Sequence, residues 1–403
     1  MKPISRLVCL LTTSVSLCSC MGPVALSKAL PDYDETVNQL VSKSLLINIA
    51  RSRHNQPPHF TDTTSIVATF NFQADATVGG QIGDSNTDTY GDFALGTTIE
   101  ENPTIELTPL RGDKFAQQLL TPLTDNQFRL LATEGLPLDL LIRLMGKAFH
   151  YQDEVGGIIR TVRNDPSIPK EYESYRRIAV HIAALNAMNE LYARRVAFTD
   201  IDYMEFSHPP SAADYLDARK AGYEFTALGD NQYSLSQQVI GNTVVTNFDT
   251  AILSDKDRVK LNTQIALTPS NLVDIEIHEG FPGGEFPLNG AIQLRSIHEI
   301  LDFIGGSISN APEYHVPPDP RSVAMLASVP GAEVFKANPA RVMTVIESPK
   351  KPEKGILNVF YRGNYYCIEQ NQWDLLAFKS LYLMMQMSGQ ASTERQFPIT
   401  ISK

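Results

Sequence analysis

A histidine and two glutamates lie close together in one segment of the sequence: His278, Glu279 and Glu285. Imidazole and carboxylate side chains bind zinc and transfer protons, so this segment is the first candidate for a metal or catalytic site. A zinc-binding helix that begins with His-Glu needs a second histidine four residues after the first. Here that position is Pro282, which interrupts a helix. We therefore expect a structured turn at 275–290, keep His278, Glu279 and Glu285 as a candidate site, and assign no catalytic residue, metal or other cofactor.

Motifs for other common chemistries are missing from the sequence. Neither the Walker phosphate loop nor GxGxxG is present, and no GxSxG nucleophile motif occurs. His298 and Asp302 are four residues apart on a predicted helix, a spacing typical of a surface pair. Cys367 stands alone and is interpreted as a small buried hydrophobic residue. These observations favour a protein that is not an enzyme, although they do not exclude a site assembled from distant residues.

The cysteines give a clearer signal. Three of the four, Cys9, Cys18 and Cys20, lie in the first twenty residues, where they could form a redox pair, part of a metal site or a processing signal. Lys2 and Arg6 precede an uncharged, mostly apolar stretch that ends at these cysteines. A short apolar segment with a basic start is typical of a secretory signal peptide, and it is shorter than the ~20 apolar residues that span a bilayer.

The end of this segment, Leu17-Cys18-Ser19-Cys20, resembles the lipobox of bacterial lipoproteins. The resemblance implies cleavage before Cys20, a diacylglycerol thioether on its sulfur, and a fatty acid such as palmitate on the new amino terminus. Each buried methylene contributes about 0.8 kcal/mol, so several acyl chains hold a protein firmly on a membrane. Met21, where other lipoproteins have aspartate, resembles the outer-membrane sorting class. Cys18 is an uncommon residue at its position, and a signal cleaved elsewhere and a chance apolar start remain alternatives.

The net charge argues against nucleic acid as a partner. The 403 residues carry a formal charge of −11, and loss of Lys2 and Arg6 with the signal peptide would make it more negative by two. Nucleic-acid binding needs a basic surface that displaces counterions from phosphates. We therefore expect a folded, acidic protein that binds no nucleic acid.

The body of the chain predicts an α+β fold with a helix-rich N-terminal half, a β-hairpin-like insertion, and a C-terminal half of mixed helix and strand. We divide the chain into a signal peptide (1–19), a tether (20–33), a mainly helical region (34–206) that contains the β insertion (61–110), and a mixed α+β region (207–403).

Periodicity predicts the individual elements. Apolar residues at helical spacing predict helices from near Asp34 to Arg53 and at 112–120, 125–134, 137–150, 170–198, 294–305 and 372–387. Alternating β-rich segments predict strands at 65–72, 104–108, 223–246, 342–346, 356–361, 365–368 and 396–401. The polar segment 74–101 predicts a long loop, and Ser211 predicts a helix cap.

Several blocks of the body are similar to a group of uncharacterised bacterial envelope lipoproteins, in which similar blocks occur in the same order. The blocks are NIARSRHNQPPHF (48–60), NPTIELTPLRGDKFAQQLLTPL (102–123), QLRSIHEILDFIGG (293–306) and GNYYCIEQNQWDLLAFKSLYLMM (363–385). This resemblance implies an envelope protein and brings no known activity with it.

The sequence as a whole favours a lipoprotein on the periplasmic face of an outer membrane, acting as a structural or assembly component of a cell-envelope complex. We expect it to bind the membrane through its N-terminal lipid and to have protein partners in the envelope. The alternatives are an envelope enzyme that acts on peptidoglycan or lipid, with residues around 278–285, and a periplasmic ligand-binding protein.

Overall fold

The computed structural model describes residues 21–81, 90–153, 157–205, 209–229, 232–254, 256–258, 261, 270–322 and 338–389. The predicted signal peptide, Cys20 and the strand predicted at 396–401 lie outside these residues. Within them the fold is α+β, which confirms the predicted fold class. The chain forms two compact units, of which the first comprises Met1–Leu45 and His59–Arg111 and the second Leu46–Pro58 and Gly112–Lys403.

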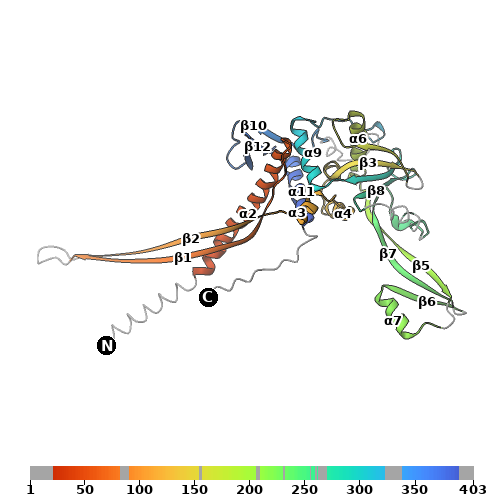
Figure 1. The fold of residues 1–403 in the computed structure, drawn as a ribbon, viewed down its shortest axis with the longest axis horizontal. Coiled ribbons are helices and arrows are strands. Elements are labelled where there is room, and N and C mark those ends of the chain that lie inside the picture. Colours follow the sequence, from red (N-terminus) through yellow and green to blue (C-terminus); the bar gives the residue numbers. More distant parts are fainter. Residues whose placement is uncertain are drawn as a thin grey trace. The chain divides into compact units, whose positions relative to one another are not determined.

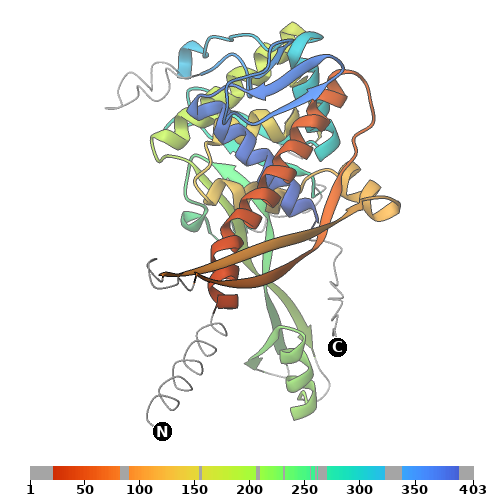
Figure 2. The ribbon, with the colours of Figure 1, turned by 90° about the vertical axis from the view of Figure 1, so that its left-hand side faces the viewer.

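The helix α2 (Met21–Arg53) begins well before the start that the sequence predicts near Asp34, so the predicted tether is helical from Met21 onward (Figure 2). The sequence prediction relied on acidic residues as a start signal, which is a weak one. The preceding residues include alanine, leucine and lysine, which are good helix formers. The last turns of α2 belong to the second unit.

A long antiparallel hairpin, β1 (Thr61–Gln81) and β2 (Tyr90–Pro109), forms the rest of the first unit (Figure 1). The register runs without a break from Ser65↔Glu106 to Gln81↔Tyr90. The loop predicted at 74–101 is therefore wrong over most of its length. Backbone hydrogen bonds hold a two-stranded ladder whatever the side chains are, so a polar composition does not exclude strands.

A mixed sheet is the frame of the second unit. Its strands are β3 (Gly146–Gln152), β4 (Ile158–Arg163), β5 (Tyr192–Glu205), β6 (Tyr223–Gly229), β7 (Gln232–Thr246), β8 (Leu272–Ile277) and β9 (Leu288–Leu294). Among the described residues their order is β4-β3-β9-β8-β7-β5, and β6 also pairs with β7. All neighbours are antiparallel except β7 and β8, which are parallel.

Helices and a smaller sheet surround this frame. The helices are α3 (Asp113–Leu120), α4 (Asp125–Thr133), α5 (Leu138–Met145), α6 (Pro169–Ala187), α7 (Ala212–Lys220), α9 (Ile297–Ser309) and α11 (Gln372–Gly389), with a short 3₁₀ helix at Thr250–Ile252. The smaller sheet contains β10 (Val345–Ser348), β11 (Asn358–Tyr361) and β12 (Asn364–Ile368) in the order β10-β12-β11. The strands predicted at 342–346, 356–361 and 365–368 are these three, with bounds shifted by a few residues.

The core of the second unit is centred on α5 and α6. Every residue of α5 except Asp139 is buried. On α6, the fully buried Tyr175 donates its hydroxyl to the carbonyl oxygen of Ile142 at 2.7 Å. A side chain at Gly146, the first residue of β3, would overlap that hydroxyl. The close approach of α6 to the start of β3 therefore requires glycine.

Two of the predicted helices are shorter than the sequence indicates. Helix α5 ends at Met145 and β3 follows directly, where the sequence predicted one helix over 137–150. Helix α6 ends at Ala187, and β5 follows where the sequence predicted a helix over 170–198. At the end of α5 the cause is a continuous apolar run, which does not distinguish a helix from a buried strand. The end of α6 is marked by Asn189, whose φ of 58° lies in the left-handed region that asparagine tolerates.

Two fully buried arginines share one buried glutamate in the core. Arg143 Nη2 lies 3.4 Å from Glu313 Oε1, and the Tyr172 hydroxyl donates to the same oxygen at 3.1 Å. Arg176 donates to the Tyr172 oxygen at 3.1 Å, and the backbone N–H of Val342 donates to Glu313 Oε2 at 2.7 Å. Burial lowers the pKa of Arg176 and raises that of Tyr172. Glu313 is thus the hub of a desolvated hydrogen-bond network.

The end of α2 is fixed to the smaller sheet within the second unit. Tyr366 donates its hydroxyl to Glu347 Oε1 at 2.7 Å, and His54 Nε2 lies 2.9 Å from the Tyr366 oxygen. Arg53 Nε lies 3.6 Å from Glu347 Oε2. The helix therefore ends against a polar cluster that includes a carboxylate, which suits the basic residue in its last turn.

Candidate functional site

The residues that the sequence suggested as a candidate site do not form a cluster in the structure. His278, Glu279 and Glu285 all lie on the exposed turn between β8 and β9, and no contact joins them. His278 Nε2 instead lies 3.2 Å from Glu276 Oε2, and this hydrogen bond raises the pKa of His278. The Asn247 side-chain amide donates to two carbonyl oxygens of the turn, each at 2.9 Å. The segment is the structured turn that the sequence predicts.

No metal site is built by the part of the chain that the structure describes. Within it, no three or more histidine, cysteine, aspartate or glutamate side chains lie close enough together to hold a metal ion. Cys367 is buried, as predicted, and burial raises the pKa of its thiol. Of the described helices, none is both long enough and apolar enough to cross a bilayer.

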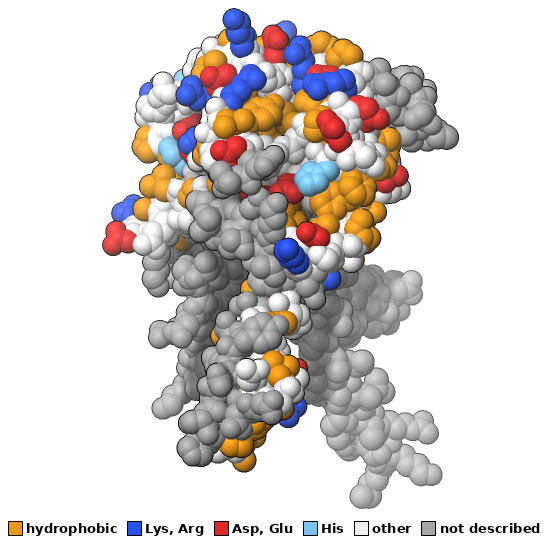
Figure 3. Space-filling model, turned by 90° about the vertical axis from the view of Figure 1, so that its right-hand side faces the viewer, with side chains coloured by type: hydrophobic (Ala, Val, Ile, Leu, Met, Phe, Trp, Pro, Cys, Tyr) orange, Lys and Arg blue, Asp and Glu red, His pale blue; other side chains and the backbone are white. Residues whose placement is uncertain are grey.

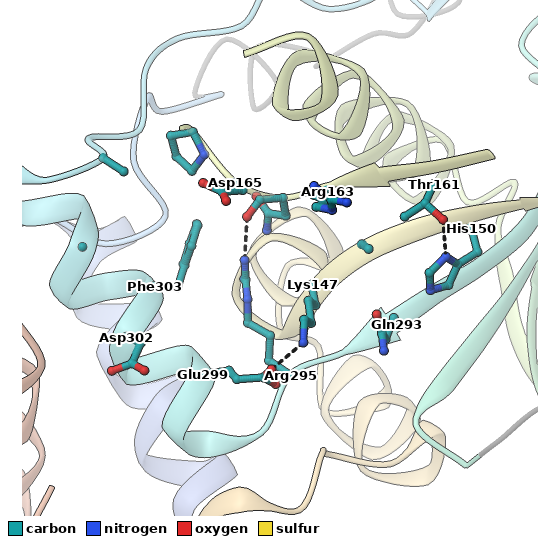
Figure 4. A pocket seen from close by; sticks show the side chains of 15 residues that line it. Lys147, His150, Thr161, Arg163, Asp165, Gln293, Arg295, Glu299, Asp302 and Phe303 are labelled. Atoms are coloured by element: carbon teal, nitrogen blue, oxygen red, sulfur yellow. Dashed lines mark hydrogen bonds and ion pairs between the residues drawn. The ribbon is translucent and has the colours of Figure 1, made fainter. Parts of the chain in front are cut away.

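A pocket of about 500 Å³ lies between the β4-β3-β9 side of the main sheet and α9 (Figure 4). Ala148 on β3 lies opposite Arg163 on β4 and opposite Gln293 on β9. Two pairs further along the same two strands, His150 lies opposite Thr161. Alternate residues of a strand point to the same face, so these five side chains form one floor. The intervening residues of β3 and β4 point to the opposite face.

The wall of the pocket is α9, whose first turn is held by a capping box. The Ser296 hydroxyl accepts from the backbone N–H of Glu299, and Glu299 Oε2 accepts from the backbone N–H of Ser296 at 2.9 Å. The other carboxylate oxygen of Glu299 accepts from Lys147 Nζ at 2.6 Å, across the mouth of the pocket. Burial alone would raise the pKa of Glu299, but these hydrogen bonds outweigh it and the pKa is lowered.

A buried arginine lies at the base of the pocket. Arg295 donates to the carbonyl oxygens of Arg143, Leu144 and Asn164 at 3.1, 3.2 and 2.7 Å. Its guanidinium carbon lies 3.9 Å from the centre of the Phe303 ring. Burial lowers the pKa of Arg295 to about 10, so the side chain is still charged at neutral pH. The base of the pocket is therefore positive.

His150 is the titratable group of the sheet floor. Its Nδ1 lies 2.8 Å from the Thr161 hydroxyl oxygen. Burial lowers the pKa of His150, and a hydrogen bond with Gln293 only partly opposes this. The imidazole is therefore mostly neutral at neutral pH and can donate or accept a hydrogen bond.

A second feature, which we call the arm, is formed by the outer parts of β5 and β7 together with α7 and β6. It comprises residues 197–240, of which the structure describes 197–205, 209–229 and 232–240. Strand β7 pairs with β8 only at Val244–Thr246, whereas its outer residues pair with β5 and β6 alone. The ladder of β5 and β7 thus continues past the last residue that touches the rest of the sheet.

The arm buries little of its own surface. Helix α7 has no buried residue and depends on its N-terminal capping box, where Ser211 accepts from the backbone N–H of Asp214 as the sequence predicts. Phe225 packs its ring against Tyr215 and Tyr233 at centroid distances of 5.1 and 6.4 Å. Large apolar side chains stay exposed on the described part of the arm: Ile201, Tyr215, Leu216, Leu228 and Ile240. Figure 3 shows hydrophobic side chains at the surface in its lower part.

Sequence reasoning missed the pocket for an identifiable reason, whereas it correctly predicted strands at 223–246, where the structure has β6 and β7 of the arm. The strands of the pocket floor, β3 and β9, were read as the end of a helix and as part of a turn region. The signal in β9 was weak: Gln293 lies between the buried residues Ile292 and Leu294, an alternation that has the period of a strand. Searches of the chain against protein-family models, curated proteins and solved structures give no match. The site therefore has to be interpreted from its own chemistry.

Proposed function

We propose that this protein is a lipoprotein, anchored through Cys20 to the periplasmic face of an outer membrane, and that it acts as a structural or assembly component of a cell-envelope complex. The observation that carries the proposal is the sequence Leu17-Cys18-Ser19-Cys20 at the end of a short apolar leader. A lipid on Cys20 would confine the body to the membrane surface, where neighbouring envelope proteins are its natural partners.

The arm supports the assembly role. Exposed apolar side chains are often used to bind other proteins when they lie together on a surface. Leu216 and Leu228 are 60% and 52% exposed, on α7 and β6 respectively. The paired backbone of the arm presents these side chains on an ordered surface, which lowers the entropy lost when a partner binds.

The membrane anchor is tested by Cys20→Ala. We expect the wild type to be labelled by a palmitate analogue in growing cells and to fractionate with the outer membrane. The variant should lose the label and leave the membrane fraction, or accumulate with its leader uncleaved. Unchanged membrane fractionation of an unlabelled protein would show that another part of the chain binds the membrane and would refute the anchor.

The assembly role is tested separately by the double variant Leu216→Ser with Leu228→Ser. Its matched control is Leu120→Ser with Leu130→Ser, because these leucines are also exposed but lie on α3 and α4. Envelopes are solubilised in mild detergent, the protein is purified, and co-purifying proteins are quantified by mass spectrometry. We expect the arm variant, and not the control, to lose specific partners. Identical partner profiles for the wild type and both variants would contradict the role of the arm.

A further inference from the structure

In the pocket beside α9, the carboxylates and the cations differ in how many hydrogen-bond partners they have. Its three carboxylates already have partners in the described structure. Glu299 accepts from Lys147 and from the backbone N–H of Ser296. Asp165 accepts from the backbone N–H and the hydroxyl of Ser167 at 2.9 and 2.7 Å. The third, Asp302, accepts from the Ser52 hydroxyl and lies 3.4 Å from His298 Nε2.

The cationic side chains of the pocket, in contrast, have N–H groups that donate no hydrogen bond to another described residue. The Arg163 side chain is 58% exposed, and its Nε forms an ion pair with Glu171 Oε2 at 3.7 Å, which is longer than a hydrogen bond. Neither Nη group of Arg163 donates to another described residue. Lys147 donates one of its three N–H bonds, to Glu299. No described carboxylate lies within ion-pair distance of Arg295, whose guanidinium faces carbonyl oxygens instead.

The position of these donors defines where an anionic group would bind. Arg163 lies directly opposite Ala148, which also lines the pocket and has no polar side-chain atom. Phe303 on α9 provides a second apolar surface, with Arg295 on its ring face (Figure 4). A planar guanidinium binds a carboxylate through two parallel hydrogen bonds. One side of the pocket therefore suits a carboxylate and the rest suits an apolar body.

The charge and size of the pocket restrict the ligand further. Three cations (Lys147, Arg163, Arg295) and three carboxylates (Asp165, Glu299, Asp302) line it. With His150 neutral, the charges of the lining balance, and Glu171, which lies outside the lining, forms an ion pair with Arg163. One negative charge can then be accepted by the unused donors, whereas a dianion would also meet the three carboxylates. A volume of about 500 Å³ falls within the range of small-molecule sites.

We propose that this pocket binds a small organic monocarboxylate, with its carboxylate on Arg163 and Lys147 and its apolar body against Ala148 and Phe303. This inference does not depend on the lipid anchor or on the assembly role. It gives the protein a binding activity at a site separate from the arm.

Binding is tested on the full chain in a non-ionic detergent by saturation-transfer difference NMR, with empty micelles as the blank. The probes are benzoate and hexanoate, together with benzyl alcohol, hexanol and phenyl phosphate. We expect saturable binding of at least one carboxylate at millimolar concentration and none of the matching alcohol. Absence of binding by both carboxylates, or equal binding of the alcohols, overturns the proposal. Tighter binding of phenyl phosphate than of benzoate overturns the assignment to a monoanion.

The site is located by Arg163→Gln, with Arg160→Gln as the matched control. Arg160 lies on the same strand but on the opposite face, outside the pocket. A hydrogen bond to a charged group contributes about 1.5–3 kcal/mol, so Arg163→Gln should weaken carboxylate binding by about tenfold or more. The control should bind like the wild type, and both variants should keep its circular-dichroism melting curve. Unchanged affinity in Arg163→Gln, or an equal loss in Arg160→Gln, overturns the assignment.

Discussion

The core and the arm of the second unit are ordered by different means. Around α5 and α6, apolar side chains are packed to zero exposure, and buried charges are held by hydrogen bonds to Glu313. In the arm, a backbone ladder and one capping box maintain the structure, while large apolar side chains remain at the surface. Because of this difference, we expect the two regions to respond separately to mutation. Mutations in the core should change the global stability, and mutations in the arm should change the binding of partners.

The largest difference between the regions should come from Glu313→Gln. Loss of this carboxylate leaves two buried arginines without their shared counter-charge, and such changes cost about 3–5 kcal/mol. The control is Glu173→Gln, which removes an exposed ion pair on α6 and should cost less than about 1 kcal/mol. Urea unfolding curves give both free energies of unfolding. Equal costs would show that the buried network is not a main source of stability.

The pH dependence of stability should come from a buried core histidine. Burial is the main reason why the pKa of His181 is lowered, to about 4, although an interaction of the imidazole with the backbone of Gly283 opposes it. The usual value is 6.5, so the unfolded chain binds a proton in the range in which the folded protein does not. Stability should therefore fall as the pH decreases from about 6.5 to about 4, by at most about 1.4 kcal/mol per pH unit.

His181→Gln should flatten this slope, measured by urea unfolding at several pH values. His278→Gln gives the contrast, because the pKa of the exposed His278 is raised by Glu276. That contact stabilises the protein at low pH and is lost as the pH rises through the folded pKa, so its removal should steepen the slope slightly. A slope that is the same in His181→Gln as in the wild type would rule out His181 as its source.

Two similar helix caps, one in each region, allow a comparison of their contributions to stability. Ser296 caps α9 in the body and Ser211 caps α7 in the arm, each through a complete capping box. Replacement of such a serine by alanine costs about 1 kcal/mol. We expect Ser296→Ala to lower the global free energy of unfolding by that amount. Ser211→Ala should leave it nearly unchanged and should instead speed amide hydrogen exchange within α7, because α7 has no buried residue. If both variants lowered the global free energy of unfolding by a similar amount, the arm and the rest of the second unit would unfold together, which would contradict the comparison.

The smallest effect on stability should come from the apolar surface of the arm. Leu216→Ser with Leu228→Ser removes exposed side chains and should change the free energy of unfolding by less than about 0.5 kcal/mol per site. The same variant should have a large effect on partner binding. A clear fall in the thermal melting temperature would mean that these leucines pack against structure and would refute their role as a free contact surface.

The sequence predicted the fold class and the cap at Ser211 because these depend on local composition and on one short motif. It failed at the end of α5, where the apolar helix runs directly into β3, and at the end of α6, which is marked in the structure by Asn189 at a positive φ. It also failed at 74–101, because the partner of each strand residue is set by pairing across the hairpin and not by its neighbours in sequence.

The pocket could not be found from sequence for a related reason. Its floor joins Arg163, Ala148 and Gln293, which become neighbours only through strand order and register. The candidate residues His278, Glu279 and Glu285 are close in sequence but lie on an exposed turn, where adjacent side chains need not converge. Proximity along the chain was a poor guide to proximity in space, whereas the tight Asn247-held turn was predictable from its proline and glycines.

The short parallel pairing of β7 with β8 gives the molecule a defined path for mechanical force. The pairing covers only Val244–Thr246 opposite Asp274–Glu276, and no other strand pair of the described sheet joins the two halves. Asp125 adds a carboxylate contact to the backbone N–H of Thr243 at 3.1 Å beside it. A partner that pulled on the tip of the arm would load this joint first, so it would yield before the core did. The arm could then detach from its partner while the core stays folded.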